Sequence, residues 1–315
     1  MSRLFRDVEG GLLCPEGSVV CIGAFDGLHL GHRALVRHAV LRARAIGVPV
    51  VALSFEPLPR EFFAQDLPLP RLTLPRARFE GLRSLGVDLV GLLRFNTGLA
   101  AMSAEDFVLD MLVTRLRARE VWVGPGFLFG RDRNGDLRTL QSLGASNGFT
   151  ANAIEAVGDG TRISSTRVRS AVATGDFPTA SRLLGRPYAI SGRVVRGNSL
   201  GRSLGYPTAN LRFGGKRPPL SGIFAVRVHG AGPGVVTGVA SFGTRPTVGG
   251  TEPLLEAHLF DFDRDLYGRR IEVEFVAKLR NEEKFADLPT LVAQMHRDAT
   301  QARTLLDAPF QQAYA

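Results

Sequence analysis

The chain has 315 residues, 44% of them hydrophobic, which predicts about two domains with enough apolar material for both cores. Thirty-nine basic and thirty acidic residues leave a net charge of +9, which suits a polyanionic partner, either a nucleic acid or a small phosphate compound. The arginines are scattered over several predicted helices and form no dense tail, so we expect a small phosphate compound and no nucleic acid.

Short apolar runs alternate with helical patterns from residue 19 to about residue 155. The runs are apolar on both sides of the chain, as strands covered on both faces must be, and they lie at 19–22, 48–55, 87–93, 121–123 and, more weakly, 149–154. Helical spacing marks 32–46, about 76–85, 103–116 and 137–147, the third opening with Ser103 and its capping partner Asp106. This alternation predicts an α/β, doubly wound, Rossmann-like domain over residues 1–185, with ligands at the carboxyl ends of its strands.

The first strand-to-helix junction reads Gly-Ala-Phe-Asp-Gly-Leu-His-Leu-Gly-His over residues 23–32 and places His29 and His32 three residues apart. The free amides of a first helical turn and the helix dipole favour anions, so a nucleoside triphosphate would bind there. A helix start with one capping and one packed histidine is the alternative, and spacing alone leaves the two level. Zinc is a weaker hypothesis, since no third histidine or thiolate lies at ligand spacing nearby.

Two further segments of the first half bear on this junction. The proline-rich stretch from Glu56 to Pro75 is predicted to be a long loop beside it. Residues 163–169, Ile-Ser-Ser-Thr-Arg-Val-Arg, indicate a second helix start with hydroxyl caps. Arg167 and Arg169 in its first turn oppose the helix dipole, which an anion nearby would offset; a plain cap with surface arginines is the alternative.

After Gly185-Arg186-Pro187 the pattern changes to short runs separated by glycines. The clearest is 271–279, where apolar residues alternate mostly with charged ones, as in an antiparallel strand with one solvated face. With runs at 192–195, 222–228 and 235–240, it predicts a small closed antiparallel β-barrel over residues 186–315. One apolar stripe from Leu288 to Leu305 predicts a terminal helix that belongs to the core.

Two features of this second half could carry chemistry. The first is a glycine-rich loop, with Gly197, Gly201 and Gly205, whose backbone can approach phosphates closely. Pro207 follows it, and then Thr208 and Asn210 offer neutral oxygens that could bind a hard cation. No Gly-Lys-Ser/Thr follows, so it is not a P-loop, and a glycine-rich hairpin is an equal alternative. Glu256 and His258 face one side of a predicted strand; a carboxylate there could accept a proton from a substrate hydroxyl, although an exposed strand glutamate is the usual case.

Four long motifs, in order, resemble the signatures of the bacterial bifunctional riboflavin kinase/FAD synthetase family. They are Gly-Ala-Phe-Asp-Gly-Leu-His-Leu-Gly-His, Ile-Ser-Ser-Thr-Arg-Val-Arg, Gly-Arg-Ser-Leu-Gly-Tyr-Pro-Thr-Ala-Asn-Leu and Glu-Ala-His-Leu-Phe-Asp-Phe-Asp-Arg-Asp-Leu-Tyr-Gly. The resemblance covers residues 15–305 approximately. It implies an N-terminal nucleotidyltransferase domain that joins FMN to ATP, giving FAD and pyrophosphate, and a C-terminal barrel that phosphorylates riboflavin to FMN.

The resemblance also implies roles for individual residues. His29 and His32 would hold the ATP phosphates and stabilise charge on the α-phosphate, without a covalent nucleophile. Other ATP contacts there would come from Gly23, Phe25, Asp26, Gly31, Ser165, Thr166 and Arg169. In the barrel, ATP and flavin would contact Gly197, Gly201, Gly205, Pro207, Thr208 and Asn210, the last two binding Mg²⁺. Glu256 would be the base that activates the terminal ribityl hydroxyl of riboflavin.

The first half departs from the family pattern at three positions. Gly126 stands where the family usually has Asn or Asp, Leu58 where it often has His, and Ala24 where Asn is common. Lost hydrogen bonds of this kind would slow adenylyl transfer or shift its affinities. Ser241 in the second half replaces a frequent Asn, and we expect little effect.

Three hypotheses follow for the whole chain. The first is the bifunctional enzyme; the second keeps the kinase and makes the first domain a weakened or regulatory nucleotide-binding module; the third, remote, is a basic nucleic-acid-binding protein. The sequence has no run of eighteen apolar residues, its start lacks a signal-peptide core, and Cys14 and Cys21 are too few for a disulfide scaffold. We therefore expect a cytoplasmic protein with small-molecule substrates and no membrane contact.

Overall fold

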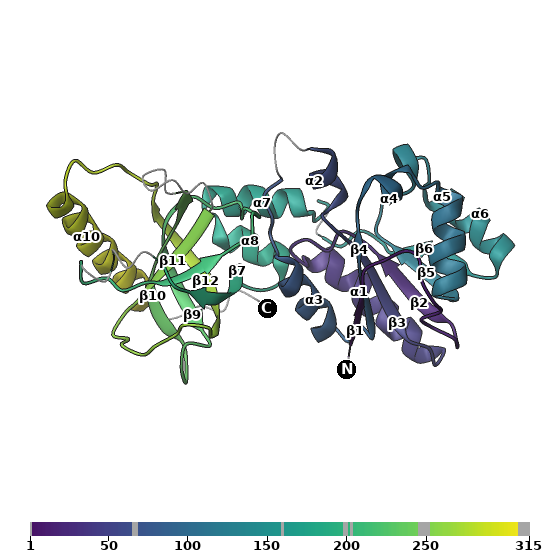
Figure 1. Ribbon diagram of the computed structural model, residues 1–315, viewed down its shortest axis with the longest axis horizontal. Coiled ribbons are helices and arrows are strands. Elements are labelled where there is room, and N and C mark those ends of the chain that lie inside the picture. Colours follow the sequence, from purple (N-terminus) through teal and green to yellow (C-terminus); the bar gives the residue numbers. More distant parts are fainter. Residues whose placement is uncertain are drawn as a thin grey trace. The chain divides into compact units, whose positions relative to one another are not determined.

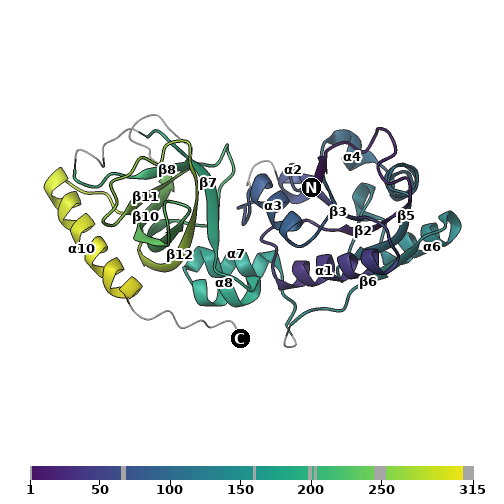
Figure 2. The same ribbon diagram turned by 90° about the horizontal axis from the view of Figure 1, so that it is seen from below.

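The computed structural model describes residues 2–64, 69–158, 161–197, 201, 204–244 and 253–307. The chain divides into two compact units, which we call the first unit (Met1–Leu69 and Thr73–Ser164) and the second unit (Pro70–Leu72 and Ser165–Ala315). Figures 1 and 2 show a sheet with flanking helices in the first unit and a barrel with a long terminal helix in the second. The division falls within the segment 163–169 that the sequence marks as a helix start.

The first unit is built on a six-stranded parallel sheet with the order β1-β4-β3-β2-β5-β6. Its strands are β1 (Arg3–Phe5), β2 (Ser18–Ile22), β3 (Val50–Glu56), β4 (Leu89–Arg94), β5 (Ala118–Val123) and β6 (Thr150–Ala153). Its helices are α1 (Leu30–Ala45), α2 (Pro59–Phe63), α3 (Pro75–Ser84), α4 (Thr97–Ala101), α5 (Ala104–Phe107), which continues with π-type bonding over Val108–Arg115, and α6 (Leu137–Asn147). The predicted doubly wound α/β class is confirmed.

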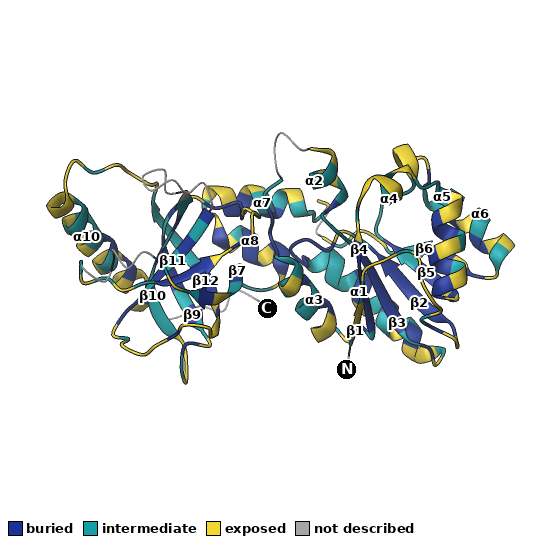
Figure 3. Cartoon of the chain, in the orientation of Figure 1, coloured by how far each residue is buried: buried dark blue, intermediate teal, exposed yellow. Residues whose placement is uncertain are grey.

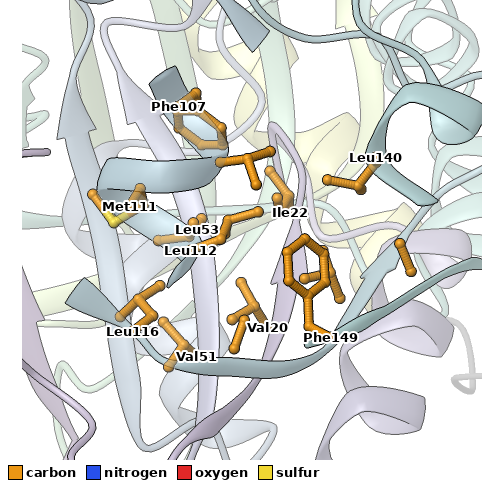
Figure 4. Close-up of a cluster of buried hydrophobic side chains, with 14 of the residues drawn as sticks. Val20, Ile22, Val51, Leu53, Phe107, Met111, Leu112, Leu116, Leu140 and Phe149 are labelled. Atoms are coloured by element: carbon orange, nitrogen blue, oxygen red, sulfur yellow. The ribbon is translucent and has the colours of Figure 1, made fainter. Parts of the chain in front are cut away.

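Apolar side chains cover both faces of this sheet, which explains the unbroken apolar runs in the sequence. All five residues of β2 are buried, at the centre of the sheet. Val19 and Cys21 pack with α1 on one face, whereas Val20 and Ile22 join the cluster on the other face that Figure 4 shows around Phe149. Figure 3 shows the same strands dark between helices that are exposed on their outer sides.

Several segments of the first unit differ from the sequence-based expectation, among them the short helix α4 (Thr97–Ala101), which was not predicted. The stretch from Glu56 to Pro75, expected to be a loop, contains the short helix α2, which begins at Pro59 with its ring in the first turn. Residues 65–68 lie outside the described residues. Strand β1 was not predicted, because it has only three residues, two of them exposed.

The second unit is a closed six-stranded barrel with the order β10-β11-β8-β7-β12-β9, all pairs antiparallel, as predicted. Its strands are β7 (Ala189–Val195), β8 (Ala209–Arg212), β9 (Gly222–His229), β10 (Val236–Thr244), β11 (Pro253–Leu259) and β12 (Arg270–Arg280). Its helices are α7 (Ser165–Thr174), α8 (Phe177–Leu184) and α10 (Leu288–Asp307). Phe177 of α8 stacks on Phe275 of β12, so this helix pair packs against the barrel.

Helix α10 packs on the outer surface of the barrel, but the predicted stripe is only partly its buried face: Leu288 and Leu305, the ends of that stripe, are exposed, whereas Asp298, Ala302 and Leu306 are buried. Ala302 and Leu306 join a buried cluster with Ala225 of β9, and the helix lies against β9, β10 and β12 (Figures 1 and 2). A buried ion pair adds to this contact, because Asp298 accepts hydrogen bonds from Arg280 Nε and Nη2, the latter at 2.8 Å. The helix therefore has a fixed place on the second unit.

Two candidate active sites

The first candidate site is the junction between β2 and α1. His29 is the N-cap of α1, with its Nδ1 accepting a hydrogen bond from the His32 amide at 3.2 Å. The two imidazoles stack, with ring centroids 3.6 Å apart and planes at 15°. A Cβ on Gly31 would lie 3.3 Å from the His29 ring, so glycine at this position leaves room for the stack. The structure brings the two histidines together as a stacked pair at a helix N-terminus.

Hydrogen bonds and an ion pair of buried polar side chains hold the loop before α1 in place. Asp26, only 1% exposed, accepts hydrogen bonds from the amide and hydroxyl of Thr73, and the same hydroxyl accepts one from the Gly27 amide. Arg78 is completely buried; it donates to the carbonyl of Ala24 and forms an ion pair of 2.6 Å with Glu56. Removing one partner of a buried ion pair is strongly destabilising, so these contacts fix the loop.

Asp26 therefore has a structural task that the resemblance did not suggest. Its Oδ1 faces Thr73, at the end of the Glu56–Pro75 stretch, and ties that stretch to the histidine loop. Gly23 and Phe25 also lie in the loop: Phe25 is fully buried, has a positive φ of 50°, and contacts the His32 ring edge-on at 5.4 Å. Their proposed contacts with ATP remain predictions.

An aromatic cluster lies at the same edge of the parallel sheet and was missed by sequence reasoning. Phe55 is near the carboxyl end of β3, Phe95 directly follows β4, and Phe62 and Phe63 belong to α2. Their ring centroids are 5.3 to 5.8 Å apart, in edge-to-face pairs. Phe63 is 69% exposed, which is unusual for so large an apolar side chain. The signal in the sequence was the Glu-Phe-Phe of residues 61–63, which is too short to interpret alone.

The two departures from the family pattern differ in their local structure. Leu58 is 3% exposed and precedes α2, so it is a core side chain. Gly126 follows β5, is exposed, and has a φ of 69°, in the left-handed region that glycine and asparagine tolerate. The nearest atom to a Cβ built there is Arg162 Nη1 at 3.4 Å, which is an ordinary contact. An asparagine therefore fits the backbone at 126.

Ser165, Thr166 and Arg169 begin helix α7 and belong to the second unit. Arg169 Nε donates to the carbonyl of Pro70 at 2.8 Å, and the amide of Arg71 donates to the carbonyl of Arg217, so residues 70–72 are bound to the barrel unit. The predicted helix start is confirmed, and a role of these residues in ATP binding remains a prediction.

The second candidate site lies on the outer face of the barrel. Leu255 and Ala257 of β11 are completely buried, so Glu256 and His258, which alternate with them, face outward. Glu256 pairs across the ladders with Asn210 of β8 on one side and with Ser241 of β10 on the other. Directly paired residues point to the same face, so the three side chains form one row. Register brings together residues that are far apart in the sequence.

Asn210 has the surroundings of a ligand-binding side chain. It is 4% exposed, and its Oδ1 has no hydrogen-bond partner among the described residues, whereas its Nδ2 donates to the carbonyl of Thr208 at 3.1 Å. A Cβ on Gly197 would lie 2.7 Å from Asn210 Nδ2, so glycine is required there for close approach of the loop. A buried amide oxygen without a partner is costly, and a hard cation with oxygen ligands, such as Mg²⁺, would satisfy it.

The glycine-rich loop folds back on itself before Thr208. The carbonyl of Gly201 accepts hydrogen bonds from the amides of Leu204 and Tyr206, and Gly205 has a φ of 83° that suits glycine. Residues 198–200, 202 and 203 of the motif lie outside the described residues. Within the described part of the chain no group of three or more His, Cys, Asp or Glu side chains could hold a metal, so a cation here would depend on neutral oxygens.

Comparison with known proteins gives consistent matches over both units. A family model of FAD synthetase matches residues 13–167, and one of riboflavin kinase matches residues 184–306. The bifunctional riboflavin kinase/FMN adenylyltransferase of Escherichia coli (strain K12) is 46% identical over 96% of this chain and 97% of that protein. The protein of the same name from Pseudomonas fluorescens is 46% identical over 93% of this chain and 95% of its own.

Solved structures agree at the level of the fold. A crystal structure described as a macrolide-efflux protein from Streptococcus pneumoniae matches with a TM-score of 0.78 and 30% identity, over 96% of this chain and 98% of that one. In the described part of this chain no helix is long and apolar enough to cross a membrane. With one family model on each part of the chain and relatives of nearly the same length, the chain belongs to the family of bifunctional riboflavin kinase/FMN adenylyltransferases.

Proposed function

We propose that the row Ser241–Glu256–Asn210 is the riboflavin kinase site of this chain and that the His29–His32 junction is its FMN adenylyltransferase site. As a member of the bifunctional family, the chain is an ATP-dependent transferase that converts riboflavin to FMN and FMN to FAD. The buried Oδ1 of Asn210, which has no hydrogen-bond partner among the residues that the structure describes and lies directly beside Glu256 in the ladder, is the observation that carries the kinase assignment.

In the kinase site, Glu256 accepts the proton of the terminal ribityl hydroxyl as its oxygen attacks the γ-phosphorus of ATP and the bond to ADP breaks. Thr208 and Asn210 would hold Mg²⁺, which supplies charge neutralisation between the phosphates when bound. Gly197, Gly201, Gly205 and Pro207 shape the backbone that approaches the phosphates. The family pattern, together with the close approach of Gly197 to Asn210, supports this arrangement.

In the adenylyltransferase site, the phosphate of FMN attacks the α-phosphorus of ATP and pyrophosphate leaves. The amides of the first turn of α1 and the stacked imidazoles of His29 and His32 stabilise the charge on the α-phosphate. Gly23, Phe25, Asp26 and Gly31 form the loop and turn against which the triphosphate lies, with further contacts from Ser165, Thr166 and Arg169. The exposed ring of Phe63 and the half-buried ring of Phe62 suit the planar isoalloxazine of FMN.

The substrates, the metal, the cellular location and the domain boundary are also part of this proposal. The substrates are ATP, riboflavin and FMN, the metal is Mg²⁺, and the chain works in the cytoplasm without nucleic-acid or membrane partners. We propose residues 1–185 and 186–315 as the two catalytic domains, because the sequence pattern changes after Gly185, the glycine that ends α8; the compact units divide earlier, between Ser164 and Ser165.

One assay tests the proposal and separates it from its main rival. Purified chain with riboflavin, ATP and Mg²⁺ should yield FMN and then FAD. FMN with ATP and Mg²⁺, without riboflavin, should yield FAD and pyrophosphate, and chromatography resolves all of these products. FMN without FAD in both mixtures would favour a regulatory first unit, a hypothesis motivated by Gly126 and Leu58. Loss of all product formation on chelation, and recovery on adding Mg²⁺, checks the metal.

A further inference from the structure

The loop that carries Thr208 is held at its start by side chains that no part of the proposed mechanism uses. His258 Nδ1 is 2.9 Å from the carbonyl oxygen of Pro207, the residue directly before Thr208. A carbonyl can only accept a hydrogen bond, so the ring donates through Nδ1. Burial is the main cause that lowers the pKa of His258 below its usual value, which favours the neutral ring with its proton on Nδ1.

The place of His258 in the barrel explains why a side chain, and not the backbone, binds the Pro207 carbonyl. The β8–β11 ladder ends at the pair of Ala209 with Ala257, and Thr208 is the residue directly before Ala209 in the chain. Beyond that pair the backbone of the loop has left the ladder, and the His258 side chain takes over by binding the Pro207 carbonyl. Glu256 lies two residues away on the same strand face, so one short strand carries both the proposed base and this contact.

A second contact connects the same loop to helix α10. The ring of Tyr206 lies edge-on to His258, with centroids 4.8 Å apart, and its hydroxyl is 2.6 Å from His296 Nδ1. Helix α10 is itself fixed on the barrel by the buried Arg280–Asp298 pair. Residues 206 and 207 are thus held from two sides before the chain enters β8.

We propose that His258 is a positioning residue of the kinase site: its hydrogen bond to Pro207 places Thr208 for Mg²⁺–ATP, and Tyr206–His296 supports the same placement from α10. The inference rests on the proposed function of the barrel site. Thr208 is the residue between the two held positions and Asn210, whose Nδ2 donates to the Thr208 carbonyl. Both ends of the metal-binding pair are therefore fixed before substrate arrives, which lowers the ordering entropy lost on binding.

The test uses the full-length chain and steady-state kinetics of FMN formation. His258→Phe keeps a ring against Tyr206 but removes the donor, whereas His258→Asn keeps an N–H donor close to the position of Nδ1. We expect His258→Phe to raise the KM for Mg²⁺–ATP about five- to tenfold, as loss of one positioning hydrogen bond would, with kcat and the KM for riboflavin changed less than about twofold. His258→Asn should restore the KM to within about twofold of the parent value.

Two controls keep the result interpretable. His229→Phe removes a similar histidine contact, the one of 3.0 Å to Glu274 on the same barrel, and should leave both KM values unchanged. The thermal unfolding transition of the barrel and the KM for riboflavin report that each variant is folded, because FAD formation from FMN reports only on the first unit. If His258→Phe fails to fold, Tyr206→Phe, which removes only the hydroxyl at His296, should still raise the KM for Mg²⁺–ATP about two- to threefold.

Several outcomes would overturn the proposal. They are an unchanged KM for Mg²⁺–ATP in folded His258→Phe or Tyr206→Phe, a His258→Asn variant as impaired as His258→Phe, or a loss confined to kcat. Failure of the proposed function is distinguishable, because it would appear in the parent chain as absence of FMN, or in Glu256→Gln as undiminished kinase activity, whatever His258 variants do.

Discussion

The two candidate sites are assembled from different kinds of sequence neighbourhood. In the first unit, His29, Gly31 and His32 lie within four residues, and the turn from β2 into α1 brings them together without help from distant parts of the chain. In the barrel, Asn210 and Glu256 belong to strands separated by the whole of β9 and β10, and only the β8–β11 register makes them neighbours. Local turns create the first site, whereas closure of a barrel creates the second.

This difference changes what a substitution does. A residue of the local site also belongs to a helix start, so its replacement affects the stability of the helix as well as chemistry. Glu256 and Ser241 of the barrel row are only partly buried and face outward from strands whose inner faces carry the core, so their replacement should affect chemistry with little change in packing, whereas Asn210 is buried. Substitutions at the two sites can therefore test whether chemistry and stability are coupled in the first site and separate in the second.

The largest effect is expected at Glu256. Glu256→Gln keeps the size and the outward position but removes the base, which should lower kcat for FMN formation by about 10²- to 10⁴-fold. FAD formation from supplied FMN and the thermal unfolding midpoint should stay near parent values. Kinetics with riboflavin and with FMN as separate substrates measure this. A comparable loss with both substrates would mean that the two sites are not independent.

The next effect concerns the two tasks of His29. His29→Ala removes both the imidazole and the N-cap, so it should lower the unfolding free energy by about 1 kcal/mol and also FAD formation. His29→Asn restores a strong N-cap without the ring, so its stability should return while FAD formation stays about 10²-fold or more below the parent. Denaturant unfolding measures the contribution of the N-cap to stability, and FAD assays measure the contribution of the imidazole to activity. Full recovery of activity in His29→Asn would show that the histidine acts only as a helix cap.

Gly126 provides a smaller and opposite test. Gly126→Asn fits a φ of 69° and an open position, so we expect the unfolding free energy to change by less than about 1 kcal/mol. Adding the amide that the family usually has should raise kcat/KM for FMN adenylylation by up to about tenfold, the value of one hydrogen bond. Gly126→Ala, which adds a Cβ without the amide, is the matched control. An unchanged kcat/KM in Gly126→Asn would show that the departure has no kinetic consequence.

The smallest effect uses the cysteines, both of which lie in the first unit. Burial raises the pKa of the Cys21 thiol to about 12 from an ordinary value of 9.0, so in the folded chain it stays protonated at pH 8 and hidden in β2. Iodoacetamide at pH 8 should leave Cys14→Ser protein unlabelled and label it fully in guanidinium. Rapid labelling of folded protein would show that the parallel sheet opens locally.

The same thiol gives the first unit a pH dependence of known sign. Above pH 9 the unfolded chain loses the proton that the folded chain keeps, so the unfolding free energy falls as the pH rises from about 9 to about 12. Cys21→Ala should flatten this slope. If the unfolding free energy of Cys21→Ala falls as steeply with pH as that of the parent, the pH dependence arises from other groups.

Most of the fold could be predicted, for different reasons in the two units. Strands such as β2, buried on both faces, produce unbroken apolar runs, and β12 alternates visibly over its first half because its outer face is solvated there. Strand β8 was not predicted, because its four residues Ala209–Arg212 follow a glycine-rich loop and gain their strand character from β7 and β11. Helix α2 was missed because a proline-rich segment favours loops.

The first site could also be predicted in part from local sequence, whereas the second could not. The His29–His32 pair was visible as a spacing, although its ring stacking was not. The adjacency of Glu256 and Asn210 could not be derived from spacing, since register is set by the barrel as a whole and entered only through resemblance to a family. The Pro207 contact of His258 was invisible, because it depends on where a ladder ends.

Because Asn210 and Glu256 are paired across strands far apart in the sequence, the kinase row can form only after most of the chain has been synthesised. The chemical sequence is kinase first and adenylyltransferase second, but the chain is made in the opposite order, and domains fold as they emerge. A nascent chain that ends before β11 already carries the complete His29–His32 turn and no kinase row. Truncation by a nonsense codon there would leave no proposed base for making FMN, while the segment that uses FMN remains intact.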